Sequence, residues 1–192
     1  FDHVRPEVLA LVPETARRIL DIGCAAGRLG EKIKERQQAT VVGIEMDEIA
    51  AAEARSRLDE VVVGNVEEMF EEGNGNPLPE LSEGCFAPKA LVPLFEAGSF
   101  DCIVCGDILE HLEAAAAVLV RARTWLAPGG RLIASIPNVR HHSVIRSLLD
   151  GNWTYEPAGL LDRDHVRFFT RREIERMFQQ AGFTIDQMQF VP

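Results

Sequence analysis

An acid and two glycines stand close together in the stretch DIGCAAG, residues 21–27. Asp21 ends an apolar run, and Gly23 and Gly27 frame the turn that follows it. Glycine lets backbone N–H groups approach a ligand closely, and the amino end of the next predicted helix adds a partial positive charge. This pattern predicts a loop that holds a nucleotide-like ligand, with a carboxylate at its entrance.

Two frames of this loop imply different ligands. Residues 25–30 read A-x-G-x-x-G, a degraded form of the dinucleotide fingerprint G-x-G-x-x-G, whereas residues 21–27 read D-x-G-x-A-x-G. Asp21 would repel a pyrophosphate, which is a dianion, but it would attract a ligand that carries an ammonium and a sulfonium group. The acid therefore favours S-adenosylmethionine over NAD as the ligand.

A second acid follows another predicted strand. Glu45 ends the run TVVGIE, 24 positions after Asp21, so both acids can stand at the carboxyl edge of adjacent parallel strands. A carboxylate at this edge can accept hydrogen bonds from both ribose hydroxyls, whichever nucleoside binds. Asp47 is the alternative candidate for this role.

The elements that must position these residues alternate along the chain between apolar strand runs and helical patterns. This order predicts an α/β fold of the Rossmann-like, doubly wound kind, with a predominantly parallel sheet and helices on both faces. Thr170 with Glu173 would form a capping box, and Pro128-Gly129-Gly130 would turn the chain into a strand. The expected strands are Arg18–Ile22, Thr40–Glu45, Val61–Gly64, Phe100–Cys105, Arg131–Ile136 and Phe183–Phe190, and the expected helices are Glu31–Gln38, Glu48–Leu58, Ala114–Leu126, Val144–Leu149 and Arg171–Ala181.

The chain length fits one domain over residues 1–192. Residues 66–99 separate two strands by more than a crossover helix needs, which predicts an inserted loop at about 70–98 with a short helix near 90–97. A second long loop, at about 150–169, is rich in aromatic and charged groups, and long ordered loops are often functional. We expect this second loop on the substrate side of the site.

The composition, with 46% hydrophobic and 26% charged residues, is that of an ordinary soluble globular protein. No apolar run approaches the roughly 18 to 20 residues that span a bilayer, and no signal-peptide pattern is seen, so we expect no membrane insertion. The net charge of −10 argues against nucleic acid as the main partner, because phosphate binding needs a basic field.

Cys102 and Cys105 form a CxxC pair, a pattern that is typical of zinc sites and redox-active cysteines. Both lie in the predicted strand FDCIVC, in which residues three apart point to opposite faces, so that one metal could not easily collect both. We therefore expect buried, reduced thiols, no metal site and a cytoplasmic setting.

Several motifs, in order and over almost the whole chain, resemble those of class I S-adenosylmethionine-dependent methyltransferases. LDIGCAAG resembles the first motif, with Ala25 where glycine is commonest, and VVGIEMDEIAAAEAR, VVVGNVEEM and FDCIVCGDILEHL resemble the next three. The resemblance implies that Asn65 and Val66 bind the adenine ring and that the sheet ends in a hairpin, whose last strand we expect to be absent here. The cofactor-binding residues implied in this way are Asp21, Gly23, Cys24, Ala25, Gly27, Glu45, Met46, Asn65, Val66, Gly106, Asp107 and Leu109.

Histidine is the natural general base for a hydroxyl acceptor near neutral pH. The catalytic candidates are His111 after one strand, His142 after another, and His165 in the second long loop. A structural alternative stands beside each of them. His111 would shape the cofactor pocket, one of His141 and His142 would be exposed without a role, and Asp164, His165 and Arg167 would form a polar cluster that pins the loop.

The stretch GLLDRDHVRFFTRREIERMFQQAGF, residues 159–183, resembles a bacterial branch of these enzymes linked to sugar and cell-surface polysaccharide modification. This resemblance implies O-methylation of a sugar, a saccharide precursor or another small molecule. Arg140, His141 and Arg167 are the candidates for contacting the acceptor. With the neighbouring Arg and His residues they would form a cationic rim for a phosphate or carboxylate, unless nearby acids pair with them.

Three rival functions remain open at this stage. A methyltransferase for a quinone-like or metabolite acceptor would share the same motifs. An interaction module that has lost catalysis would bind the cofactor without turning over any acceptor. An NAD-dependent enzyme is disfavoured by Asp21.

Overall fold

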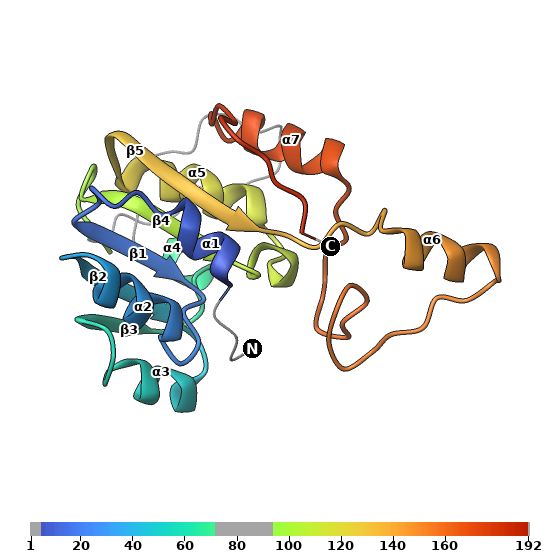
Figure 1. The fold of residues 1–192 in the computed structure, drawn as a ribbon, viewed down its shortest axis with the longest axis horizontal. Helices are drawn as coiled ribbons and strands as arrows, with labels where there is room; N and C mark the ends of the chain where they lie inside the picture. The colour runs from blue at the N-terminus through green and yellow to red at the C-terminus, as the bar shows by residue number, and fades with distance from the viewer. Residues whose placement is uncertain (1–4, 72–93, 192) are drawn as a thin grey trace.

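A computed structural model describes residues 5–71 and 94–191. Its centre is a wholly parallel five-stranded sheet in the order β3-β2-β1-β4-β5 (Figure 1). The strand order reverses at β1, and ligands of such sheets bind at the carboxyl ends of the strands beside that reversal. The strands are β1 (Arg18–Ile22), β2 (Thr40–Glu45), β3 (Glu60–Val63), β4 (Phe100–Gly106) and β5 (Leu126–Ser135).

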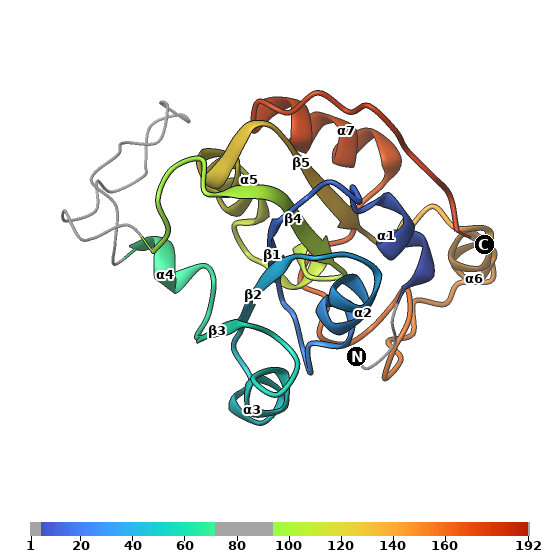
Figure 2. The ribbon, with the colours of Figure 1, turned by 60° about the vertical axis from the view of Figure 1, so that its left-hand side comes forward.

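Helices cover both faces of the sheet. The helices are α1 (Pro6–Leu11), α2 (Arg28–Arg36), α3 (Glu48–Ala54), α4 (Glu68–Glu71), α5 (Ala115–Trp125), α6 (His142–Leu149) and α7 (Arg171–Gln180), with one 3₁₀ turn, η1 (Leu109–His111). Helices α1 and α2 lie on one face and α5 and α7 on the other (Figure 2). Helix α6 extends away from the sheet on the side where the strands end.

Successive strand residues feed two separate cores. In β4, Cys102 and Val104 pack with α1, α2 and α3, whereas Ile103 and Cys105 pack with α5 and α7. The two cysteines of the CxxC pair thus face opposite sides of the sheet, as predicted from strand periodicity. They and Cys24 are buried free thiols, and burial raises the pKa of Cys102 to about 12.

Most predicted elements are confirmed, two of them to the residue (β1 and β2), but three details are wrong. Residues 183–191 are extended without pairing to the sheet, so the predicted strand Phe183–Phe190 does not form. Thr170 begins α7 without a side-chain cap, so the capping box is not made. Strand β5 begins at Leu126 and runs through Pro128-Gly129-Gly130, with a register shift against β4.

The predicted inserted loop lies mainly outside the described residues. Of the short helix expected near 90–97, residues 94–97 are described, and they are not helical. None of the helices in the described ranges has the length and apolar character that crossing a bilayer requires.

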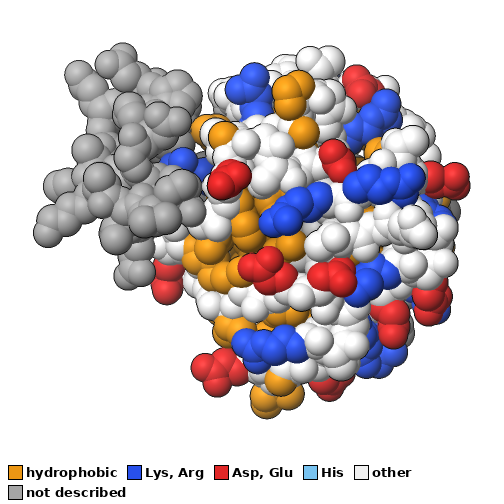
Figure 3. All heavy atoms as spheres, turned by 90° about the vertical axis from the view of Figure 1, so that its left-hand side faces the viewer, with side chains coloured by type: hydrophobic (Ala, Val, Ile, Leu, Met, Phe, Trp, Pro, Cys, Tyr) orange, Lys and Arg blue, Asp and Glu red, His pale blue; other side chains and the backbone are white. Residues whose placement is uncertain are grey.

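Figure 3 shows the face formed at the amino ends of the strands. On it, basic and acidic side chains intermingle around an apolar area, and no histidine is seen among its described residues. The grouped histidines and the glycine loop lie at the other, carboxyl edge of the sheet. The site is therefore to be sought at that edge.

Candidate active site

The loop after β1 turns sharply through three left-handed backbone positions. Gly23 and Gly27 have φ of 74° and 77°, and Ala25 has φ of 46°. A Cβ atom on Gly23 would lie 3.0 Å from the Ile108 side chain, and one on Gly27 would lie 3.1 Å from Ala54 Cα. The packing of the loop against its neighbours thus requires glycine at both positions, whether or not a ligand is bound. Ala25 adopts a conformation that disfavours any side chain.

Asp21 lies under this loop, at the end of β1, and is 3% exposed. Burial, and secondly the negative charge of Glu45, raise the pKa of its carboxyl group from 3.8 to about 7. A cationic ligand beside Asp21 would reverse this effect, because it favours the charged carboxylate. The site is therefore electrostatically prepared for an ammonium or sulfonium group.

Glu45, at the end of β2, is linked directly to the loop. Its Oε2 accepts a hydrogen bond from Ala25 N at 2.8 Å, and its Oε1 accepts one from Asp47 N at 2.9 Å. Asp47 instead caps α3, since its Oδ1 accepts a hydrogen bond from Ala50 N at 2.7 Å. Of the two acids, Glu45 is the one placed beside the loop.

The other residues expected to touch a cofactor differ in what they present. Asn65, after β3, uses its Oδ1 to accept a hydrogen bond from Glu67 N at 2.9 Å. Cys24 and Leu109 are buried in the two cores, so a ligand could meet only their backbone. Met46 is 65% exposed, and a Cβ on Gly106 would meet no heavy atom within 4 Å. Space thus opens beside the ends of β2 and β4.

Asp107 follows β4 in a left-handed conformation, with φ of 56°. Its Oδ1 accepts a hydrogen bond from Ser135 Oγ at 2.6 Å, and its Oδ2 lies 2.6 Å from Nη2 of Arg5. These contacts tie together the ends of β4 and β5 and the residue before α1. Backbone strain that is held by its surroundings in this way is concentrated at functional sites.

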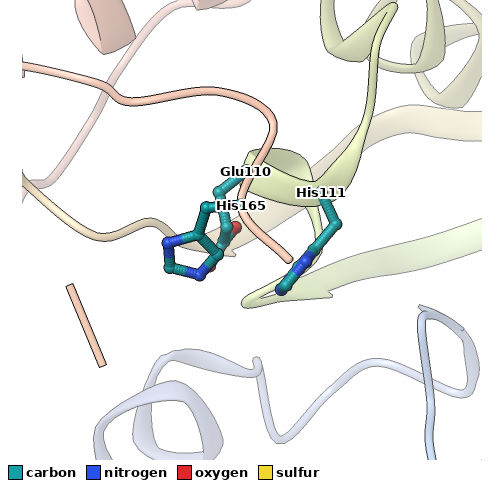
Figure 4. Close-up of side chains that lie close together, drawn as sticks. All are labelled: Glu110, His111 and His165. Atoms are coloured by element: carbon teal, nitrogen blue, oxygen red, sulfur yellow. The ribbon is translucent and has the colours of Figure 1, made fainter. Parts of the chain in front are cut away.

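Glu110, His111 and His165 form a compact group after β4 (Figure 4). Glu110 is 1% exposed, and neither carboxylate oxygen has a hydrogen-bond partner among the described residues. His165 is also buried, and its Nε2 lies 3.9 Å from Glu110 Oε1. Burial is the main cause that raises the pKa of Glu110 to about 8 and lowers the pKa of His165. Glu110 and His165 are thus buried and only partly satisfied, whereas His111 is half-buried.

The loop that carries His165 is fastened to η1 through the backbone. Val166 N and Arg167 N both donate to the carbonyl oxygen of Glu110 at 3.0 Å, and His111 Nδ1 lies 3.0 Å from Asp164 O. Arg167 also donates from its guanidinium to Glu113 O. The loop is thus pinned, as predicted, but the contacts that pin it run to Glu110, His111 and Glu113.

Aromatic side chains continue from His165 toward solvent. The ring centroids of His165 and Phe168 are 6.2 Å apart, and those of Phe168 and Trp153 are 5.3 Å apart. Tyr155 lies 6.2 Å from Phe168, and both Trp153 and Tyr155 are exposed. Planar apolar surface is thus available next to the buried histidine.

His141 and His142 belong to a different neighbourhood, at the start of α6. His141 caps this helix through Nδ1, and its ring centroid is 4.2 Å from that of the exposed His142. Val139 N donates to Phe169 O at 2.9 Å, so the chain after β5 and the chain after His165 lie side by side. The structure thus groups His165 with His111, and places His142 separately on α6.

Two hollows of the described surface lie outside this region. One, of about 210 Å³, is at the amino edge of the sheet between Asp101 and Arg131 and contains none of the predicted site residues. The other, of about 340 Å³, runs along α6 past His142, Arg146 and Asp150. Because neither contains the glycine loop, we place the site by the geometry of the strand ends.

Three polar residues at this edge of the sheet were not predicted from the sequence: Arg5, Glu110 and Ser135. Glu110 lies in the stretch FDCIVCGDILEHL quoted above, but the neighbouring residues do not indicate that its side chain is buried. Arg5 and Ser135 gave no signal, because their role follows only from contact with Asp107.

Comparison with known proteins agrees with this geometry. A family model described as "Methyltransferase domain" matches residues 2–188. Ubiquinone biosynthesis O-methyltransferases are similar in sequence, at 25% identity in Acinetobacter baumannii strain AYE and 28% in Aeromonas salmonicida. Each of these alignments covers 90% of this chain and 65% of the relative, so the chain spans less than two thirds of their length.

Solved structures share the fold. A SAM-dependent methyltransferase of Thermotoga maritima superimposes with a TM-score of 0.63 at 22% identity, covering 93% of this chain and 68% of the other. Phosphoethanolamine N-methyltransferase 2 of Haemonchus contortus, in complex with S-adenosyl-L-methionine, gives 0.63 at 19% identity, covering 94% and 37%. A family match over nearly the whole chain, on this fold, shows that the chain belongs to the methyltransferase domain family.

Proposed function

We propose that this chain is the catalytic domain of an enzyme that transfers the methyl group of S-adenosylmethionine to a hydroxyl oxygen of a small molecule. The observation that carries the proposal is the meeting of His111, His165 and Glu110 just after β4, whose last residue, Gly106, has open space where a side chain would stand. Histidine and carboxylate groups there can take up or direct the proton of a hydroxyl.

The cofactor would lie across the carboxyl ends of β1, β2 and β4. Asp21 would attract the ammonium and sulfonium groups, Glu45 would accept the ribose hydroxyls, and Asn65 with Val66 would meet the adenine. The backbone of Gly106, Asp107 and Leu109 would lie under the methionine part. An in-line attack of the acceptor oxygen on the methyl carbon forms the O–C bond and breaks the C–S bond. The sulfur keeps the electron pair, and the hydroxyl proton leaves to a base or to solvent.

Two acceptor classes have support. The relatives named for ubiquinone biosynthesis, together with the aromatic rings of Trp153, Tyr155 and Phe168, favour a planar phenol or quinol. The stretch at residues 159–183, which resembles the polysaccharide-linked branch, favours a sugar or saccharide precursor, whose ring also packs on aromatic side chains. We rank the phenolic acceptor first, since the sequence relatives support it directly.

The test has two stages. Isothermal titration should show binding of S-adenosylhomocysteine and no binding of NAD, and equal or tighter NAD binding would refute the cofactor assignment. Formation of S-adenosylhomocysteine should then be measured with catechols and quinols in one panel and sugars and sugar nucleotides in another. Turnover restricted to the sugar panel would reverse our ranking. Cofactor binding without turnover in either panel would indicate an interaction module.

A further inference from the structure

The group of buried Glu110 and His165 with half-buried His111 has a composition that hydroxyl activation by a histidine alone does not explain. We infer that it is a binding site for a divalent first-row transition-metal cation that holds the acceptor hydroxyl, an inference that rests on the proposed function. From the residues alone we expect no metal site, but the fold brings together residues 55 positions apart, which changes that expectation.

The first step of the argument is the state of the carboxylate. Both oxygens of Glu110 are buried without a hydrogen-bond partner among the described residues, and Asp162, also 1% exposed, has an unpartnered Oδ2. Leaving such groups unpaired inside a protein is costly, so native structures compensate buried charges by pairing or by metal coordination. Asp107 and Asp162 add negative charge around Glu110, and Arg5, which pairs with Asp107, adds a positive charge. A bound cation would satisfy this group.

The second step is distance. The ligand atoms of the three side chains all lie within 4.8 Å of one another, and His165 Nε2 is 3.9 Å from Glu110 Oε1. That separation is too long for a hydrogen bond. Two ligand atoms that each lie about 2.1 Å from one metal are about 3 to 3.5 Å apart, so small side-chain movements close the set.

The third step is orientation. When His111 Nδ1 donates to the Asp164 carbonyl at 3.0 Å, the lone pair of this imidazole is on Nε2. A backbone carbonyl on the other ring nitrogen is the usual way in which proteins orient a metal-binding histidine. The two hydrogen bonds from Val166 N and Arg167 N to Glu110 O hold the His165 loop against η1. The two segments that carry the ligand atoms, η1 and the His165 loop, are thus held together by hydrogen bonds.

Two imidazoles and one carboxylate suit Zn²⁺, Mn²⁺, Fe²⁺ or Co²⁺ better than Mg²⁺ or Ca²⁺, which prefer all-oxygen ligands. Three protein ligands leave at least one position open for the acceptor. Coordination lowers the pKa of the bound hydroxyl, whose proton passes to solvent. Its oxygen then forms the bond to the methyl carbon while the C–S bond breaks and the electron pair stays on sulfur.

The test measures metal binding apart from activity. The full chain, without an affinity tag and after dialysis against chelator, is titrated with Zn²⁺ and Co²⁺, with calorimetry and the visible absorption of bound Co²⁺ as readouts. We expect one ion per chain. Glu110→Gln and His165→Gln should each weaken binding about 100-fold or more, because each removes one of three ligands. Glu156→Gln, at an exposed acid of the same loop, is the matched control and should leave metal affinity unchanged.

Stability gives a second readout if a variant folds poorly. Metal should raise the Tm of the wild-type protein but not that of Glu110→Gln, since only a species that binds is stabilised. Without metal, Glu110→Gln should be at least as stable as the wild type, because the amide removes a buried acidic group. Equal metal affinity in both ligand variants and the wild type, or no binding at micromolar concentrations, would overturn the site. S-Adenosylhomocysteine binding by Glu110→Gln, expected within about threefold of wild type, reports separately on the proposed function.

Discussion

Glu45 at the end of β2 accepts a hydrogen bond from the backbone N–H of Ala25 in the loop after β1, at 2.8 Å. One carboxylate thus supports the loop and remains half-buried at the edge where the ribose is proposed to lie. The acid on the second strand and the loop on the first therefore act as one unit.

Replacement of Glu45 tests this unit. Glu45→Ala should weaken S-adenosylhomocysteine binding about 100-fold, since hydrogen bonds to a charged group contribute about 1.5 to 3 kcal/mol each and overlap here. Glu45→Gln keeps one oxygen acceptor and should weaken binding by only about tenfold. Asp47→Ala, which removes the cap of α3, should lower stability by about 1 kcal/mol and leave the affinity within about threefold. A larger affinity loss in Asp47→Ala than in Glu45→Ala would mean that the wrong acid was chosen.

Ala25 offers a test of backbone strain. Its φ of 46° costs a residue with a side chain about 1 to 2 kcal/mol, and glycine loses about 0.4 to 1 kcal/mol through its freer unfolded state. Ala25→Gly should therefore raise the free energy of unfolding by roughly 0.5 to 1 kcal/mol in denaturant titrations. The neighbouring Ala26 has no positive φ, so Ala26→Gly should destabilise the protein. Destabilisation by both changes would contradict the strain at Ala25.

Asp21 predicts a dependence of stability on pH. Its folded-state pKa of about 7 exceeds the ordinary 3.8, so the folded protein holds a proton that the unfolded chain has released. The contribution of Asp21 to stability therefore falls as the pH rises from about 4 to about 7 and then levels off. The neighbouring Cys24 and Cys105 stay protonated in this range, because burial raises their thiol pKa values.

Asp21→Asn should remove this contribution, whereas that of Glu110, whose pKa burial raises to about 8, should remain. Above pH 7 the variant should unfold at a higher temperature than the wild type, by an amount worth up to about 4 kcal/mol, and the difference should vanish near pH 4. The same change should weaken S-adenosylhomocysteine binding, because the amide has no charge for the ammonium group. Parallel wild-type and variant stability curves between pH 4 and 8 would show that Asp21 is not protonated in the free protein.

An anionic acceptor is tested at the exposed arginines. Among the described residues, no carboxylate lies within 4.0 Å of the charged nitrogens of Arg140. Arg140→Ala should raise the KM for a phosphorylated or carboxylated acceptor about fivefold, with unchanged affinity for the cofactor product, and added salt should reduce the difference. Arg172→Ala, on the exposed side of α7, is the control. If the wild-type protein had equal KM values for charged and uncharged acceptors, the proposed cationic rim would be refuted.

Arg167 was grouped with Arg140 on sequence grounds, but its guanidinium donates to Glu113 O. Its replacement would therefore loosen the loop that carries His165 as well as change charge. Replacement of Arg140 therefore tests the effect of charge on acceptor binding without this second effect on the loop.

Local patterns were sufficient wherever the signal lies within a few neighbouring residues. Strands β1 and β2 were predicted to the residue because buried parallel strands are continuous apolar runs, and Cys102 and Cys105 were assigned to opposite faces by strand periodicity. The position of Glu45 beside the glycine loop was predicted because parallel strands end at one edge of a sheet. The position of the glycine loop followed from its own residues.

Other features depend on contacts between distant parts of the chain. The segment 183–190 has the apolar pattern of a strand, but a strand exists only with a paired neighbour, and the sheet supplies none. Glu110 and His165 read as separate polar residues until the loop hydrogen-bonds to η1 and buries both. By itself, the sequence determined the five parallel strands, the loop and the chemistry of their side chains, because these follow from short-range periodicity and residue type. Only the tertiary structure decided which of those side chains share a buried site, because burial and separation in space depend on how the whole chain packs.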